Sequence, residues 1–179
     1  DSLTCNFVAD TIRLIAKSTY RPVITASAQS ACDGDTITLS ILGPVVSLKW
    51  STGEVTSSIK VTSSGLYFCT VIDSTGCTKT TPVASITINA LPKPTIIANR
   101  SVVLCLDDTV DLSTSKQYQT YRWSTGSTSP SIRVSVSGTY TVSVIDSNGC
   151  SGISDTIEVT VLNTRNRAEF QFDAGSNGY

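Results

Sequence analysis

The sequence predicts an all-β fold made of two tandem β-sandwiches. The first observation is an internal repeat, because the tetrapeptide Trp-Ser-Thr-Gly at 50–53 returns at 123–126, an offset of 73 residues (123 minus 50). The second is that apolar side chains alternate with Ser and Thr over short segments, which is the period of a β-strand. The third is that turn signals such as Asp33-Gly34 and Asn148-Gly149 separate these segments.

The repeat places the domain boundaries. We expect one sandwich at 21–91 and a second at 92–162, joined by the short proline-containing segment Leu91-Pro92-Lys93-Pro94. Residues 1–20 match the end of the repeat, so they are expected to form the last strand of a preceding repeat. Residues 163–179 leave the repeat and are expected to form a linker and the first strand of a following PKD-like domain. The chain is therefore expected to be a segment of a longer array.

Alternating apolar residues predict the strands of each sandwich. In the first repeat these strands are expected at 37–41, 48–50, 59–61, 67–71 and 86–88. In the second they are expected at 110–112, 121–123, 132–136, 140–144 and 157–161. Helical periodicity is missing, and the nearest candidate, 11–16, is too short to stand as a helix.

Composition argues against several functions. Thirteen Lys and Arg against 14 Asp and Glu give a net charge of −1, which disfavours binding to nucleic acids. The absence of His removes the commonest general base, and no glycine-rich phosphate loop is present, so the chain is not expected to be an enzyme. No apolar run approaches the ~18–20 residues of a membrane span, so no membrane insertion is expected.

The recurring aromatic residues are expected to be structural. Trp50 and Trp123 fit the buried aromatic of the third strand, against which the opposite sheet packs; the alternative is an exposed platform that stacks on a ligand. Tyr67 and Tyr140 each follow a glycine by two residues, the position of an immunoglobulin-type tyrosine corner. The fold class is therefore a tandem of immunoglobulin-like β-sandwich repeats.

Six cysteines in an all-β repeat indicate an oxidising compartment. The repeat favours the equivalent pairs Cys32–Cys77 and Cys105–Cys150, each closing a loop of 45 residues (77 minus 32, 150 minus 105). Such a bridge contributes roughly 4 kcal/mol in the chain-entropy model. Immunoglobulin topology places these cysteines at opposite poles, whereas a disulfide needs Cα atoms within ~7 Å. Pairing of Cys32 with Cys69, or with Cys150 across the domain junction, therefore stays open.

Cys69 aligns with Val142 on an inward-facing strand position. A buried free thiol that packs like a small apolar residue is the simplest interpretation. Cys5 is expected to lack its partner, which would lie upstream. We expect native thiol labelling to find no reactive cysteine, with Cys69 modified only after unfolding.

Several motifs together resemble a known family. Cys-x-Gly-Asp, Trp-Ser-Thr-Gly, Ser-Gly-x-Tyr and Asp-Ser-x-Gly-Cys are similar to the immunoglobulin-like and PKD-like repeats of large secreted surface proteins of the Bacteroidota. That group includes gliding-motility adhesins exported by the type IX secretion system. The resemblance covers residues 1 to about 162; it departs at 105–108, which lacks the glycine, and at Thr4, which replaces the glycine before Cys5. It implies a non-catalytic module on the extracellular cell surface, a stalk or adhesive segment of a large adhesin.

The same resemblance implies partners and a modification. The partners are neighbouring domains of a longer chain, surface polysaccharide or other cell-surface proteins. Secreted proteins of this lineage are O-glycosylated at Asp-Ser/Thr-apolar (or Thr) triplets, although Asp-Thr-Ile also opens a strand without any modification. The hydroxyl residues of such triplets are Ser2, Thr11, Thr36, Ser74, Thr109 and Thr156.

No cofactor is expected. Asp33, Asp35, Asp107 and Asp108 lie in loops, but two carboxylates in each loop fall short of the six to eight oxygens of a calcium site. Turn and strand-cap roles are the expected ones.

Two alternative functions belong to other classes. The first is an accessory carbohydrate-binding or spacer module of a secreted polysaccharide-degrading enzyme, in which Trp or Tyr side chains would stack on sugar. The second is a subunit of a surface filament, in which residues 1–20 would be donated to the sheet of a neighbour.

Overall fold

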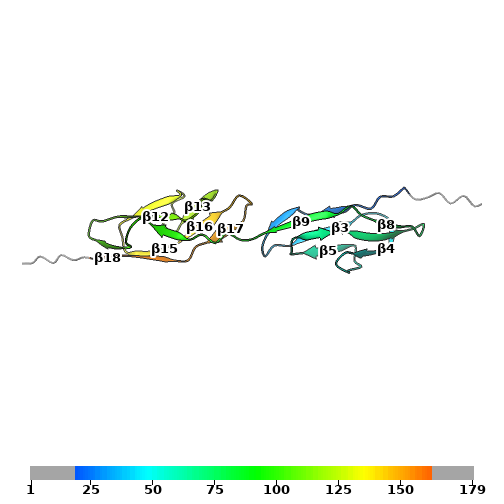
Figure 1. The fold of residues 1–179 in the computed structure, drawn as a ribbon, viewed down its shortest axis with the longest axis horizontal. Helices are drawn as coiled ribbons and strands as arrows, with labels where there is room; N and C mark the ends of the chain where they lie inside the picture. The colour runs from blue at the N-terminus through cyan, green and yellow to red at the C-terminus, as the bar shows by residue number, and fades with distance from the viewer. Residues whose placement is uncertain (1–18, 163–179) are drawn as a thin grey trace, which may run out of the picture. The chain divides into compact units, whose positions relative to one another are not determined.

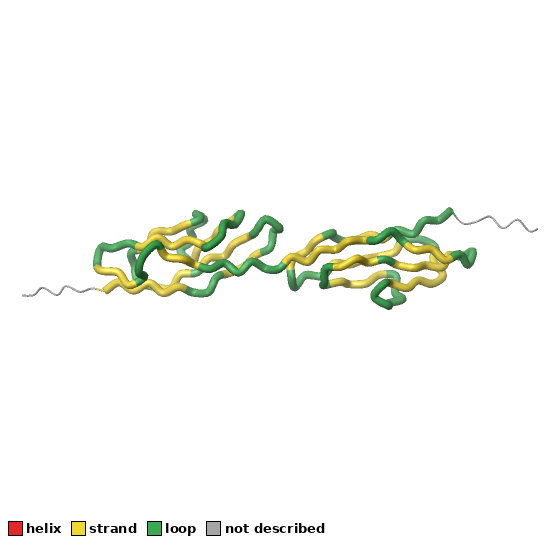
Figure 2. Tube along the Cα trace, viewed as in Figure 1, coloured by secondary structure: helices red, strands yellow, loops and turns green. Residues whose placement is uncertain are grey.

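The structure, a computed structural model, describes residues 19–162, which form eighteen β-strands and no helix (Figures 1 and 2). The prediction of an all-β fold is confirmed for these residues. The chain divides into two compact units, and the division falls between Ile88 and Asn89.

The first unit contains nine short strands. Their bounds are β1 Ile24–Ala26, β2 Ser30–Cys32, β3 Ile37–Ile41, β4 Val45–Trp50, β5 Ser58–Val61, β6 Gly65–Tyr67, β7 Cys69–Asp73, β8 Thr78–Thr80 and β9 Ala84–Asn89.

The second unit repeats the same succession. Its strands are β10 Ile96–Ala98, β11 Val103–Cys105, β12 Val110–Thr114, β13 Thr120–Trp123, β14 Ser131–Val134, β15 Gly138–Tyr140, β16 Val142–Ile145, β17 Ser151–Ile153 and β18 Ile157–Leu162.

Strand pairing is the same in both units. In the first, the pairing orders are β1-β3-β5, β2-β9-β6 and β4-β7-β8; in the second they are β10-β12-β14, β11-β18-β15 and β13-β16-β17. Each strand of the second unit therefore corresponds to the strand of the first unit whose number is lower by nine. β15 lies antiparallel beside β18, whereas β11 is parallel to it (Figure 1).

Each unit is a sandwich with one core. Buried side chains from β3 and β5 on one face meet buried side chains from β4, β6, β7 and β9 on the other, and in β3, β5 and β7 alternate residues point inward. The members of the first core are Ile37, Leu39, Ile41, Trp50, Ile59, Val61, Tyr67, Cys69, Val71 and Ile86. The second core is built at the equivalent positions, with Leu104 from β11 and Tyr121 from β13 added and with Thr114 in the place of Ile41 outside it.

The repeated Trp-Ser-Thr-Gly tetrapeptide is a tight turn at the end of β4 and of β13. In the first copy the N–H of Gly53 donates to the carbonyl of Trp50 at 2.9 Å, and Gly53 has φ of +104°, in the left-handed region that favours glycine. The hydroxyl of Ser51 accepts from the N–H of Phe68 at 3.3 Å, and Ser124 does the same for Thr141 at 3.2 Å. The motif therefore ties the turn to the neighbouring strand.

A second pair of hydroxyls supports the same strand from its other side. Thr81 Oγ1 accepts from the N–H of Cys69 at 3.0 Å, and Ser154 Oγ accepts from the N–H of Val142 at 3.0 Å. Both hydroxyl residues are buried. They satisfy N–H groups at the break between β6 and β7 and between β15 and β16, where a missing partner would cost free energy.

Candidate functional site

The cysteines differ in bonding state. Cys32 and Cys150 are each disulfide-bonded. Cys69, Cys77 and Cys105 are free thiols. The predicted pairs Cys32–Cys77 and Cys105–Cys150 are therefore wrong, because one member of each pair is free. The free Cys105 is exposed, contrary to its expected place in a disulfide.

The positions of the cysteines within each unit explain the failure. In the second unit Cys105 pairs with Leu162, the last residue of β18, so it lies at the C-terminal pole of that unit. Cys150 lies in the turn before β17, at the other pole, two residues before Gly152, which lies close to Pro92. The six residues of β18 alone span roughly 20 Å at ~3.3 Å per residue, which is well beyond the reach of a disulfide.

The first unit has the same arrangement. The N–H of Thr87 donates to the carbonyl of Gln29 at 3.0 Å, which is the counterpart of the 2.9 Å bond from Thr160 to Val102 in the second unit. Cys32, three residues after Gln29, therefore lies beside the end of β9 at the C-terminal pole. Each unit thus carries one cysteine at each pole, too far apart for a bond within the unit.

The N-terminal pole of each unit is formed by an Asp-x-x-Gly-Cys turn. Asp73 Oδ1 accepts from the N–H groups of Thr75 at 2.9 Å and Cys77 at 3.1 Å. In the second unit Asp146 Oδ1 accepts from Asn148 and Cys150, both at 2.9 Å. The free Cys77 is therefore held in the same turn geometry as the bonded Cys150.

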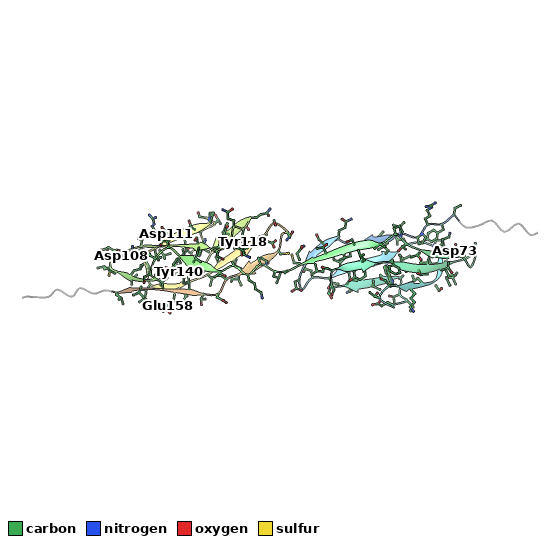
Figure 3. The ribbon with its side chains drawn as sticks, in the orientation of Figure 1. Asp73, Asp108, Asp111, Tyr118, Tyr140 and Glu158 are labelled. Atoms are coloured by element: carbon green, nitrogen blue, oxygen red, sulfur yellow. The ribbon has the colours of Figure 1, made fainter. Side chains whose placement is uncertain are left out.

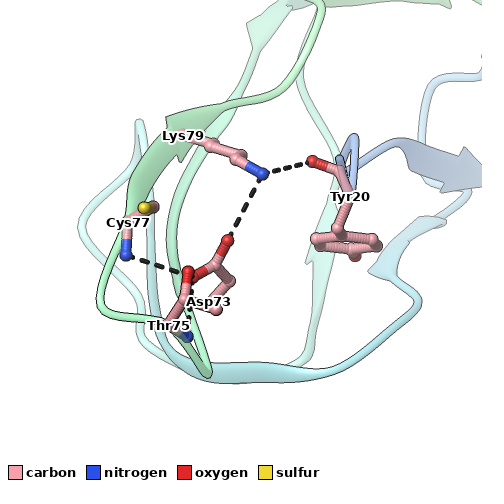
Figure 4. A network of polar contacts seen from close by, with 5 residues as sticks. All are labelled: Tyr20, Asp73, Thr75, Cys77 and Lys79. Carbon is pink, nitrogen blue, oxygen red and sulfur yellow. Dashed lines mark hydrogen bonds and ion pairs between the residues drawn. The ribbon is translucent and has the colours of Figure 1, made fainter. Parts of the chain in front are cut away.

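In the first unit this turn carries an additional polar network (Figure 4). Lys79 Nζ lies 3.3 Å from Asp73 Oδ2 and donates to the backbone carbonyl of Tyr20 at 2.7 Å. Asp73 is only 2% exposed, so the lysine neutralises a carboxylate that water hardly reaches. The second unit has Gly152 at the position of Lys79, where an added Cβ would lie 1.9 Å from the carbonyl oxygen of Pro92. Sequence reasoning missed this network, although the Lys/Gly difference between the copies signals it.

The C-terminal poles also share a turn. The N–H of Asp35 donates to the carbonyl of Cys32 at 3.0 Å, and the N–H of Asp108 donates to that of Cys105 at 3.1 Å. Asp108 lies at this pole of the second unit (Figure 3) and forms an ion pair with Arg100 at 2.8 Å. Thus the free, exposed Cys105 occupies the same local structure as the bonded Cys32.

One residue of this turn departs from the repeat. Gly34 has φ of +93°, and its counterpart Asp107 has φ of +69°, the one non-glycine residue with positive φ among residues 19–162. Aspartate is among the few residues that tolerate this region. The missing glycine in the second copy therefore leaves the turn intact.

Cys69 is a buried free thiol, as its alignment with Val142 predicts. Both side chains are fully buried in their cores. Burial raises the pKa of the Cys69 thiol, so the nucleophilic thiolate is disfavoured. This cysteine is a packing residue.

The four recurring aromatic residues lie in the two cores. Trp50 and Trp123 are each 2% exposed, and their indole N–H groups donate to the carbonyls of Thr56 at 2.8 Å and Ser129 at 2.9 Å. Tyr67 and Tyr140 are buried, and each hydroxyl donates at 2.8 Å to a carbonyl four residues earlier. Neither indole is available as a platform for a sugar ring.

The acidic loops hold no cluster of metal ligands within residues 19–162. Asp35 Oδ2 accepts from the N–H of Cys32 at 3.3 Å, and Asp108 forms an ion pair with Arg100. These carboxylates therefore stabilise the loops in which they lie. Asp33 and Asp107 lie exposed beside them. The part of the chain that the structure describes also has no helix able to cross a membrane.

The candidate glycosylation sites fall into two groups. Thr36, Ser74, Thr109 and Thr156 are exposed. Ser2 and Thr11 lie outside the described residues, as do Cys5, nearly all of the expected strand at 1–20 and the whole of 163–179.

The chain matches no protein-family model and no curated sequence. It is similar to several solved structures. One is murine CEACAM1b, at 10% identity over 79% of this chain and 100% of that chain, with a TM-score of 0.40. Another is the fibronectin(III)-like modules of Clostridium thermocellum CbhA, at 17% identity over 78% and 93%, with a TM-score of 0.38. A third is the mouse nectin-like molecule 4 ectodomain, at 16% identity over 81% and 65%, also 0.38. These likenesses concern the fold and say nothing about a ligand.

Proposed function

We propose that this chain is a non-catalytic extracellular module of tandem immunoglobulin-like sandwiches, at 21–91 and 92–162, which serves as a stalk segment of a larger cell-surface adhesin. The observation that carries the proposal is that both units repeat one succession of strands, each around a single core.

The surroundings of the recurring aromatics support a spacer over a binding module. Carbohydrate-binding surfaces present aromatic faces to solvent, whereas Trp50 and Trp123 are in the cores with their N–H groups satisfied. The same buried indole with the same kind of hydrogen bond occurs in both units, which is typical of a structural role.

The extracellular location rests on the disulfide, since such bonds persist in oxidising compartments. Placement on the surface of a Bacteroidota cell rests on the motif resemblance alone. Under that placement the exposed Thr36, Ser74, Thr109 and Thr156 are the residues to carry O-glycans. Intact-mass spectrometry of protein from its natural source tests this, and an unmodified mass for all four sites would refute it.

The stalk proposal is tested by single-molecule force spectroscopy. In a force experiment on the reduced chain, we expect two separate cooperative unfolding events of similar length, one for each unit. Gradual extension without force peaks would refute a load-bearing role.

The runner-up is a carbohydrate-binding module of a secreted enzyme. It is tested by titrating the folded chain with soluble polysaccharides while recording tryptophan emission and the melting temperature. We expect neither to change. A saturable shift in either would favour the runner-up.

A further inference from the structure

The C-terminal pole of the second unit exposes a group of large apolar side chains. They are between 43% and 66% exposed, and together they are called the apolar patch: Val103, Leu106, Val136 and Leu162. The residues at the equivalent positions of the first unit, 73 places earlier, are Ser30, Asp33, Ser63 and Asn89. Because the same strand order forms in both units, the fold does not need apolar residues at these positions. The patch therefore serves something other than the fold of the unit.

Strand pairing brings the patch together around the end of β18. On one side of this strand, Leu162 pairs with Cys105 of β11, which Leu106 follows directly. On the other side, Val136 lies beside the same strand end, because the hydroxyl of the following serine accepts from the N–H of Val161 at 2.7 Å. Neighbouring strands lie ~4.8 Å apart, so the patch spans about 10 Å across β11, β18 and β15.

We propose that the apolar patch is a docking surface for the segment of this chain that follows it, 163–179, and that Phe170 and Phe172 cover it. The segment lies outside the described residues, but it begins at the patch, since Leu162 is the last residue of β18. Phe170 comes eight residues later (170 minus 162), a reach of up to about 27 Å at ~3.4 Å per residue. This reach exceeds the width of the patch, so surface and occupant meet within one molecule at a high local concentration.

The segment carries apolar residues at the spacing that a flat apolar surface needs. Ala168, Phe170 and Phe172 alternate with Glu169 and Gln171. Alternate side chains of an extended chain point to the same side, so the two phenylalanine rings can face the patch while the polar residues face water. Docking then removes apolar surface from water on the segment and on the patch alike.

Charges at this pole also match those of the segment. Arg165 and Arg167 lie between the patch and the two phenylalanines. The turn after β11 presents the exposed carboxylate of Asp107, next to Asp108, which forms an ion pair with Arg100 at 2.8 Å. A basic stretch that leaves β18 therefore meets an acidic turn.

The first unit offers an internal comparison. Its equivalent pole is polar, and the residues that follow its last strand, 90–95, contain no aromatic residue and no arginine. The apolar pole and the aromatic, basic segment thus occur together after the second unit and are both missing after the first.

The docking goes beyond the stalk function and does not depend on it. It assigns Phe170 and Phe172 to the second unit, whereas the sequence pattern alone places them in the first strand of a following PKD-like domain. Extension without force peaks would refute the stalk and leave the docking standing. An uncovered patch would refute the docking and leave the stalk standing.

The test uses the exposed thiol of Cys105, whose residue pairs with Leu162, as a reporter of coverage. All chains are full-length and carry Cys5→Ser and Cys77→Ser, so that the remaining free thiols are Cys105 and the buried Cys69. The rate at which an uncharged maleimide alkylates Cys105 is followed by peptide mass spectrometry.

Three changes are compared with this parent chain. Phe170→Ser with Phe172→Ser removes the proposed occupant. Val136→Ser with Leu162→Asn gives the patch the residues that the first unit has at these positions, so the fold accommodates them. Gln171→Ser is the matched control, because it alters the segment between the two phenylalanines without removing an apolar side chain.

We expect both double variants to raise the alkylation rate at least tenfold over the parent, and the control to leave it within twofold. Equal rates in all four chains would show that the segment does not cover the patch and would overturn the proposal. Slow alkylation of the parent that speeds up on dilution would show that a second copy is the occupant, which also overturns it. Urea unfolding, followed by tryptophan emission, checks that all four chains are folded.

Discussion

Loss of the positive charge of Lys79 should destabilise the first unit. Lys79 Nζ lies 3.3 Å from Asp73 Oδ2, and Asp73 is only 2% exposed. Lys79→Met removes the cation, so the buried carboxylate loses its partner. A surface ion pair contributes about 0–1 kcal/mol and breaking a buried pair costs about 3–5 kcal/mol, so for this partly exposed lysine we expect a loss of about 2 kcal/mol.

The assay is urea unfolding followed through Trp50, with Trp123 replaced by phenylalanine so that only the first unit is observed. Lys60→Met is the matched control, because Lys60 is an exposed lysine of the same unit and its replacement should leave the unfolding midpoint unchanged.

Two further predictions concern the stability of single units, each measured by urea unfolding followed through one tryptophan, with the other unit's tryptophan replaced by phenylalanine. Asp107→Gly should stabilise the second unit by about 0.5 kcal/mol, because relief of a left-handed conformation worth about 1–2 kcal/mol exceeds the added entropy of glycine in the unfolded chain, about 0.4–1 kcal/mol. Thr81→Val should destabilise the first unit by about 1–3 kcal/mol, because the buried N–H of Cys69 loses its acceptor.

Each of these has an outcome that contradicts it. A destabilised Asp107→Gly chain would mean that the aspartate side chain makes contacts that outweigh its backbone strain. Full stability in Thr81→Val would show that another acceptor serves the N–H. An unchanged midpoint for Lys79→Met would place the carboxylate in water, contrary to its burial.

The sequence alone determined the all-β class and the inward positions. Alternation of period two and glycine-containing turns are local, so they act wherever the segment lies. The 73-residue offset then aligned residues that share an environment, which is why Cys69 could be predicted to be buried from its counterpart Val142. The burial of Trp50 and Trp123 in two equivalent cores follows from the same alternation.

Tertiary structure decided which cysteines are bonded and which are free, and it formed the polar network at the N-terminal pole of the first unit. Equivalence within the repeat suggested bonds inside each unit, but the parallel pairing of β11 with β18 carries Cys105 to the pole opposite Cys150. Segments far apart in sequence form that pairing, and no local pattern encodes it. Likewise, the two copies differ at Lys79 and Gly152, but the sequence does not show the role of the lysine. Its role follows from the fold, which places Lys79 Nζ beside the Asp73 carboxylate and the Tyr20 carbonyl. Contacts between segments that are far apart in the sequence could not be predicted from it, because only the pairing of distant strands decides which side chains meet.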